Sequence, residues 1–283
     1  MIGFINLFKE EGYSSAKAVS DIKRIVNAPC GHMGTLDPMA SGVLPVGIGK
    51  ATRLFPYMIE KQKEYVAEFT FGEERDTLDK TGAITNTTFS IPTEEEIKKV
   101  LPLFLGEVEQ VPPKYSAKSV GGKRGYQLAR EGVDFSLSPK KVMIYGLDLI
   151  ERTGDKSFLF NIKCGGGTYI RSISRDLGYK LNSLAYMSKL VRNKSGIFTS
   201  STAVKTEELK KAEDISAYLI PADSVVNFPK LILSKEKAKK LLDGVYEKGE
   251  YKDGLYRVYN EEEFFGVGEV SDTILKMKSY VRE

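Results

Sequence analysis

The segment GHMGTLDPMASG, residues 31–42, holds the side chain best placed for chemistry, Asp37. A residue that precedes proline, here Pro38, is pushed toward extended backbone geometry. Glycines on both sides allow a sharply turned loop that the backbone of another molecule can approach. A carboxylate held on such a loop can act as a nucleophile or as a base. Because Asp-Pro also begins ordinary turns, the residues alone leave both a catalytic and a turn-forming role open for Asp37.

The residue counts exclude several kinds of metal site. His32 is the only histidine, and the only cysteines, Cys30 and Cys164, lie far apart in the sequence. HExxH sites, Cys₂His₂ fingers and His₃ zinc centres all need more ligands than these, so no metal is expected. Acid–base chemistry must then rest mainly on carboxylates, tyrosines or lysines. Two separated cysteines also suit a reducing compartment better than a disulfide scaffold.

Two glycine-rich segments come close to phosphate-binding patterns. The segment GVLPVGIGK, residues 42–50, fails the Walker A pattern because Lys50 comes two residues too late. The segment CGGGT, residues 164–168, precedes a predicted helix whose N-terminus could bind a phosphate or a phosphodiester. Thr168 is therefore a candidate RNA-binding residue.

Charge is distributed unevenly along the chain, although the 283 residues carry a net charge of only +4. Residues 114–141 hold seven basic and two acidic side chains, and residues 163–194 hold seven basic and one acidic side chain. These two segments, the basic blocks, leave the rest of the chain acidic. Charge separated in this way can form a surface that faces an anion; a solvated lysine-rich face is the alternative.

The hydrophobic pattern predicts strands and helices that are interspersed along the chain. Strands are expected at residues 3–8, 65–71, 141–150 and 157–164. Helices are expected after Ser14 or Ser15, after Thr93 and after Gly167. A glycine-punctuated loop is expected for residues 31–49. This mixture favours an α+β fold.

Two domains are expected, a catalytic domain over residues 1–225 and a small β-rich domain over residues 230–283. Pro221 and Pro229 bracket the expected linker. No stretch approaches the ~18 apolar residues of a membrane span. The N-terminal segment reaches charged residues too early for a signal peptide. We therefore expect a cytoplasmic protein with no membrane partner.

Several ordered motifs make the chain similar to a known family. The segment GHMGTLDPMASGVLPVGIGKATRL, residues 31–54, closely resembles the signature loop of the TruB-type tRNA pseudouridine synthases, which make pseudouridine-55 in the TΨC arm. The other matching segments are KEYVAEFTFG at 63–72, DTLDKTG at 76–82, PPKYSA at 112–117, GKRGYQLAREG at 122–132 and GGTYIRSISRDLG at 166–178. The resemblance covers about residues 3–200, and the tail looks like the PUA-like RNA-binding domain of such enzymes.

The resemblance implies a fold, an activity and a set of active-site residues. The fold is the mixed pseudouridine synthase sheet with flanking helices, and the activity is the isomerisation of uridine to pseudouridine, which needs no cofactor and no metal. Asp37 matches the essential catalytic aspartate; attack on C1′ and removal of a ribose proton both remain open as its role. Tyr65 matches the tyrosine that stacks on the target base, as an aromatic face permits; a plain core role is its alternative. Arg171 matches the arginine that pairs with the aspartate, and Asp79 the acid that orients this arginine.

Further residues match positions that contact RNA or line the pocket. His32 matches the histidine that meets the RNA near the flipped base, and Leu190 the leucine that lines the pocket. Lys9 stands where the family has the lysine of a KPxG motif, with Glu10 in place of the proline. The remaining expected RNA-binding residues are Lys123, Arg124 and Tyr126.

Two other classes of protein remain open at this point. A glycosidase with Asp37 and Asp79 as its two carboxylates would leave the basic blocks unexplained. A non-catalytic RNA-binding protein would explain the basic blocks but not the loop around Asp37. Among pseudouridine synthases, the guide-RNA-dependent relatives are a further alternative, although they usually carry a larger PUA domain. The expected partner is the TΨC stem-loop of tRNA, and the expected state is a monomer.

Overall fold

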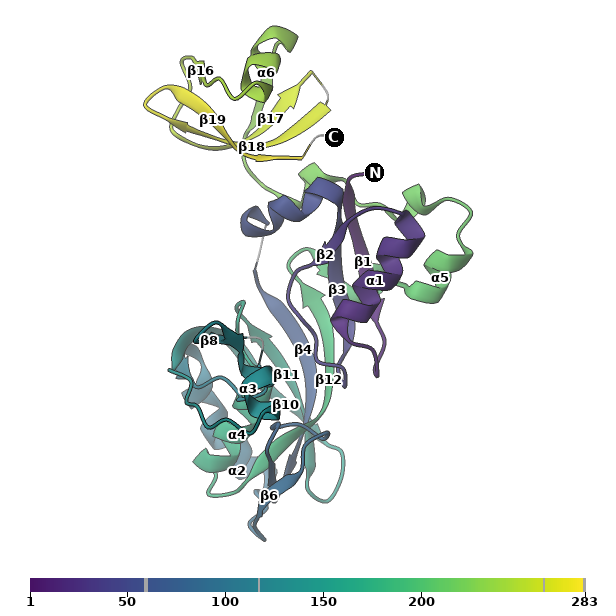
Figure 1. The fold of residues 1–283 in the computed structure, drawn as a ribbon. Coiled ribbons are helices and arrows are strands. Elements are labelled where there is room, and N and C mark those ends of the chain that lie inside the picture. Colours follow the sequence, from purple (N-terminus) through teal and green to yellow (C-terminus); the bar gives the residue numbers. More distant parts are fainter. Residues whose placement is uncertain (59–60, 117, 262, 282–283) are drawn as a thin grey trace. The chain divides into compact units, whose positions relative to one another are not determined.

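The computed structural model describes residues 1–58, 61–116, 118–261 and 263–281, and the side chains of Val120, Arg124 and Leu242 lie outside this description. The chain divides into two compact units. The first unit comprises Met1–Asp37, Gly42–Lys61 and Ser195–Glu283, and the second unit comprises Pro38–Ser41 and Gln62–Lys194. Figure 1 labels their helices and strands.

The first unit contains ten strands and several short helices. Its strands are β1 (Gly3–Lys9), β2 (Cys30–His32), β3 (Ser41–Ile48), β13 (Phe198–Thr199), β14 (Val204–Lys205), β15 (Lys230–Leu233), β16 (Glu247–Lys248), β17 (Gly254–Asn260), β18 (Glu263–Ser271) and β19 (Ile274–Tyr280). Its helices are α1 (Ser15–Val26), η1 (Gly49–Tyr57), η3 (Ser200–Thr202), α5 (Thr206–Lys211), η4 (Ile215–Tyr218), η5 (Ala222–Val225) and α6 (Lys235–Leu242).

Helix α1 begins and ends where the sequence predicts. The Ser14 side chain accepts a hydrogen bond from the backbone N–H of Lys17, which satisfies one of the free N–H groups of the first turn. Asn27 ends the helix in the left-handed conformation, at φ 48°. Ala18 and Ile22 face the core. The predicted helix is therefore confirmed.

The segment from residue 31 to residue 49, predicted to be a loop, forms much of β2 and β3 instead. Strand β3 pairs antiparallel with β1, from Lys9↔Gly42 to Gly3↔Ile48, and its other edge pairs with β2. Nearly all of β3 is buried, and a strand buried on both faces shows an unbroken apolar run rather than alternation. Pro45 has no N–H to donate within the strand, and its carbonyl accepts a hydrogen bond from the N–H of Met33.

The segment between Pro221 and Pro229 is packed rather than a free linker. Ala222, Val225 and Val226 are buried in one cluster with Phe4 and apolar residues from the rest of the first unit. The residues that follow form a five-stranded sheet in the order β15-β17-β18-β19-β16. The proposed domain limits, 1–225 and 230–283, stay a prediction.

The second unit is built on a sheet with the strand order β12-β4-β11-β10-β7. Its strands are β4 (Lys63–Phe71), β5 (Glu73–Arg75), β6 (Ile84–Thr87), β7 (Gly106–Gln110), β8 (Ser119–Val120), β9 (Lys123–Arg124), β10 (Lys140–Arg152), β11 (Ser157–Cys164) and β12 (Ala185–Ser195). Its helices are α2 (Glu94–Val100), η2 (Leu101–Phe104), α3 (Gly125–Arg130) and α4 (Ile170–Lys180). A capping box of Thr93 and Glu96 begins α2, the helix expected after Thr93, and the strands expected at 141–150 and 157–164 pair with each other as β10 and β11. No helix in the described parts of the chain is long and apolar enough to cross a membrane.

Aromatic pairs between β4 and β11 fill the core of the second unit. Phe69 stacks on Phe160 with ring centroids 4.7 Å apart, and Phe71 meets Phe158 edge-on at 5.7 Å. Both pairs join diagonal positions of the antiparallel ladder. This core fixes the sheet on which α4 and the active-site candidates of the second unit are placed.

We predict that Phe160→Ala lowers the free energy of unfolding by about 3–5 kcal/mol, because it leaves a cavity and removes the stacked ring. Phe89→Ala is the matched control, since Phe89 is fully exposed and its loss should change stability by less than about 0.5 kcal/mol. Urea unfolding followed by circular dichroism measures both. Equal effects of the two substitutions would contradict this assignment of the core.

Candidate active site

The loop that carries Asp37 is fixed on its N-terminal side by Ser15, the first residue of α1. The N–H of Leu36 donates to Ser15 Oγ at 2.9 Å, and Ser15 Oγ donates to the carbonyl of Leu36 at 2.9 Å. Both Ser15 and Leu36 are buried, so the residue before Asp37 is held on both of its backbone groups. Gly34 takes φ 78°, a conformation that favours glycine. Asp37 itself is half-buried.

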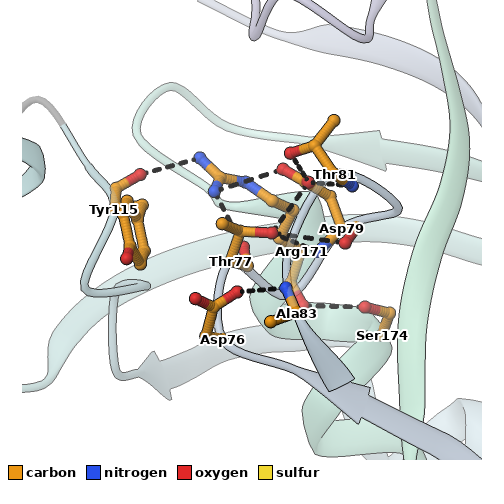
Figure 2. Close-up of polar contacts among 8 residues, drawn as sticks. All are labelled: Asp76, Thr77, Asp79, Thr81, Ala83, Tyr115, Arg171 and Ser174. Atoms are coloured by element: carbon orange, nitrogen blue, oxygen red, sulfur yellow. Dashed lines mark hydrogen bonds and ion pairs between the residues drawn. The ribbon is translucent and has the colours of Figure 1, made fainter. Parts of the chain in front are cut away.

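A buried carboxylate, Asp79, organises the turn between β5 and β6. Its Oδ1 accepts hydrogen bonds from Thr77 Oγ1 at 2.8 Å, from the Thr81 N–H at 2.9 Å and from Thr81 Oγ1. Its Oδ2 lies 3.5 Å from Nη1 of Arg171. Figure 2 shows the Asp79 side chain between the two threonines and the arginine. The carboxylate therefore has donors on both oxygens, as a buried charge requires.

The guanidinium of Arg171 is held by two segments of the second unit, the Asp79 turn and the loop at Tyr115. Nη1 donates to the carbonyl of Thr77 at 2.9 Å, and Nη2 donates to the carbonyl of Tyr115 at 3.0 Å (Figure 2). Together with Asp79 these contacts fix the plane of the guanidinium, whose donors have a rigid geometry. Arg171 is buried, so the side chain presents a positioned positive charge rather than a mobile surface cation.

The Asp79 turn is itself strained and tied to β12. Leu78 takes φ 61°, which is unfavourable for a residue with a Cβ. The N–H of Met187 donates to the Leu78 carbonyl at 3.0 Å, and the N–H of Lys80 donates to the Met187 carbonyl at 3.1 Å. These two bonds hold the turn in place. Backbone strain of this kind gathers at functional sites.

A buried glutamine fixes the start of helix α4, the helix that carries Arg171. Gln110 Nε2 donates to the Tyr169 carbonyl at 3.1 Å, and Gln110 Oε1 accepts from the Tyr169 N–H at 2.8 Å. The Thr168 hydroxyl donates to the Gly165 carbonyl at 3.0 Å, so it stabilises the preceding turn. An RNA contact by Thr168 stays a prediction.

Tyr65 and Leu190 lie on neighbouring strands of the second unit, β4 and β12. Tyr65 is 5% exposed and shares a face of β4 with Ala67, Phe69 and Phe71. Leu190 is 6% exposed. Their places at the edge of the core suit contact with a base, and the stacking role of Tyr65 stays a prediction.

The residues expected to contact RNA differ in their exposure. Lys123 is exposed and pairs with Glu131 at 2.9 Å, and the exposed ring of Tyr126 lies under Arg130. His32 is half-buried on β2. The side chain of Arg124 lies outside the described residues.

Lys9 is buried and binds the backbone of its own turn, and its contact with RNA stays a prediction. Its side chain is 1% exposed, and Nζ donates to the carbonyls of Glu10 at 3.0 Å and Tyr13 at 2.6 Å. The ammonium thus caps the turn between β1 and α1. Burial of the amine by the residues that follow it, which sequence reading does not reveal, gives Lys9 an internal role.

The structure joins Asp79 to Arg171 directly and places Tyr65 and Leu190 on adjacent strands, all within the second unit. Asp37 and His32 belong to the first unit. Sequence reasoning missed Ser15, Thr77, Thr81 and Gln110 as positioning residues. The threonines flanking Asp79 in DTLDKT were a usable signal, because short hydroxyl side chains often bind nearby carboxylates and backbone groups. Among the described residues, no three metal-ligand side chains gather in one place.

Two protein-family models match the chain. The model for the N-terminal domain of TruB family pseudouridylate synthases matches residues 23–170, and the model for the C-terminal part of pseudouridine synthase II TruB matches residues 229–277. A tRNA pseudouridine synthase B from Clostridium kluyveri is 38% identical, over 98% of this chain and 98% of its own. The chain belongs to the TruB family. It is therefore an isomerase that forms pseudouridine from uridine.

Other TruB proteins and solved structures agree with this membership. The tRNA pseudouridine synthase B of Borreliella burgdorferi strain ZS7 is 40% identical, over 92% of both chains. A chain in the crystal structure of an archaeal box H/ACA Nop10–Cbf5 complex matches with a TM-score of 0.70 at 24% identity, over 99% of this chain and 86% of that chain. The latter likeness concerns the fold. The predicted α+β pseudouridine synthase fold with a β-rich C-terminal domain is confirmed.

We predict that Asp79→Asn lowers the free energy of unfolding by about 3–5 kcal/mol, because it leaves the buried Arg171 charge without its carboxylate. Asp76→Asn is the matched control: Asp76 lies in the same turn, is exposed, and accepts one hydrogen bond from the Ala83 N–H. Its loss should cost about 1 kcal/mol or less. Chemical unfolding measures both variants. If Asp79→Asn is as stable as Asp76→Asn, the ion pair does not hold the turn.

Proposed function

We propose that the protein converts uridine 55 in the TΨC loop of tRNA to pseudouridine and that Asp37 is its catalytic residue. The observation that carries the proposal is the match of the TruB family to most of the chain, together with the GTLD segment, residues 34–37, in the place of the family's catalytic loop. The relatives that match over nearly the whole chain are named as enzymes that act on tRNA. The protein would act as a cytoplasmic monomer.

The reaction is an isomerisation within one nucleotide. The N1–C1′ bond of the uridine breaks, the base turns, and a C5–C1′ bond forms while C5 loses its proton and N1 gains one. Atoms and electrons balance without an oxidant or reductant. The base must leave the stack to reach the carboxylate, as in other enzymes that act on a base. Asp37 either attacks C1′ or removes a ribose proton; both need an ionised carboxylate at the end of a fixed loop.

Three residues of the second unit would support the chemistry. Arg171 matches the family's arginine that pairs with the catalytic aspartate, and a guanidinium in that role favours the charged form of the carboxyl. Its fixed contacts with Thr77, Asp79 and Tyr115 make it suited to this task. Tyr65 would stack on the flipped base, and Leu190 would line the apolar side of the pocket.

The exposed members of the basic blocks would bind the phosphates of the RNA. Tyr126 and Thr168 would also contact the RNA, and His32 would contact it near the flipped base. Lys123 and Arg124 lie in the first block. A glycosidase would form no pseudouridine in the experiments below. A non-catalytic RNA-binding protein would bind tRNA there but would also form no pseudouridine.

We predict that the wild-type protein forms pseudouridine in the TΨC loop of an unmodified tRNA transcript and that Asp37→Asn does not. The substitution keeps the shape of the side chain but removes its charge, so the rate should fall by about 10²- to 10⁴-fold or more, while RNA affinity stays within a few-fold of wild type. Carbodiimide modification followed by primer extension maps the product. Loss of RNA binding in Asp37→Asn would make Asp37 a structural residue, and normal turnover would remove it from the mechanism.

We further predict that the logarithm of the affinity for tRNA falls linearly with the logarithm of the salt concentration, with a slope of several units, because bound phosphates release counterions. Lys123→Gln should reduce the slope by about 0.7–0.9, the value for one phosphate contact. Lys98→Gln is the control, since Lys98 is exposed and pairs with Glu94 outside the basic blocks. A flat salt response would show that the basic blocks are only solvated.

A further inference from the structure

Lys63 is a half-buried lysine that neither the fold nor the reaction proposed above uses. It begins β4 and lies on the same face of the strand as Tyr65, two residues further on. Its partner across the ladder is Cys164 of β11, which is fully buried. The Lys63 side chain therefore lies on the same face of the sheet as the tyrosine, about 7 Å away along the strand.

The groups that act on the Lys63 ammonium include no carboxylate. Burial, and then the positive charge of Arg192 on β12, lower the pKa of Lys63 to about 8, and only the charged thiolate form of Cys164 would oppose this shift. Burial raises the pKa of Cys164 to about 11, so the thiol is neutral at pH 7. Glu64, the next residue, points to the opposite face of β4. The described part of the chain offers the Lys63 ammonium no hydrogen bond and no ion pair.

Such an arrangement disfavours the charged lysine in the free protein. A buried ammonium near a second cation loses hydration and gains no compensating contact. An anion bound at this place would reverse both effects, because it would contact Lys63 directly and lie near the charge of Arg192. The site is therefore suited to bind an anion on the face of β4 that carries Tyr65.

We propose that Lys63 is a positioning residue that binds the phosphate adjacent to the target uridine. This inference rests on the proposed function, since it takes the base to be stacked on Tyr65. The phosphates on the 5′ and the 3′ side of that nucleotide share the same chemistry, and the experiment separates them. The alternative is that the Lys63 stem only packs on the sheet while its amine reaches solvent. That result would refute the proposal.

The test uses TΨC stem-loop RNAs in which one linkage, 5′ or 3′ of the target uridine, is an uncharged methylphosphonate. Binding of each RNA is measured for the wild type, Lys63→Met and Lys63→Arg, with Lys61→Met as the matched control because Lys61 is exposed and two residues away. Neutralising one of the two linkages should weaken wild-type binding by at least about tenfold. The same change should have no effect on Lys63→Met and its full effect on Lys61→Met.

The pH dependence provides an independent measurement that a merely structural role would not affect. The penalty for the uncharged linkage should shrink from pH 7 to pH 9 in the wild type, because the ammonium deprotonates while Arg192 stays charged and Cys164 stays largely a thiol. In Lys63→Arg the penalty should persist at pH 9. Equal penalties in the wild type and Lys63→Met at both linkages, or a pH-independent penalty in the wild type, would overturn the proposal. Absence of pseudouridine formation by the wild type would overturn the proposed function and leave these binding differences interpretable.

Discussion

The buried ion pair of Asp79 and Arg171 is the contact on which the arrangement of the second unit's active-site candidates depends. A buried guanidinium is tolerated only when its donors are met. Here two segments that are far apart in the sequence supply the acceptors, the turn at Thr77 and Asp79 and the loop at Tyr115, while helix α4 carries the arginine itself. The strained turn at Leu78 and its backbone hydrogen bonds with Met187 hold Asp79 where it can pair with the guanidinium. The Arg171 guanidinium thus links the Asp79 turn and the Tyr115 loop to helix α4.

The structure divides the positive charge of the basic blocks into two kinds. Arg171 and Arg192 are buried and act inside the second unit. Several others form exposed ion pairs with nearby acids: Lys114 with Asp134, Lys123 with Glu131 and Lys141 with Glu107. Exposed pairs of this kind contribute little stability, so a phosphate can replace the carboxylate at small cost. The net charge of +4 therefore says little about the surface that RNA would meet.

Local signals predicted much of the fold, and non-local contacts explain the failures. The cap at Ser14, the capping box at Thr93 and the alternation in β4 depend on neighbouring residues, so they can be read from the sequence. Strand β3 was missed because it is apolar throughout and contains Pro45. The roles of Gln110 and Ser15 depend on partners 59 and 21 residues away, and no local pattern reveals such partners. Asp37 and Arg171 were found through the family resemblance rather than through physical patterns alone.

Release of tritium from tRNA transcripts labelled at C5 of uridine tests the catalytic role of Asp37, because formation of the C5–C1′ bond expels that atom. We expect release by the wild type from a transcript with uridine at position 55, no release when that position is cytidine, and no release by Asp37→Asn although it still binds the RNA. Release by Asp37→Asn at the wild-type rate, or release that persists without uridine 55, would contradict the proposed function.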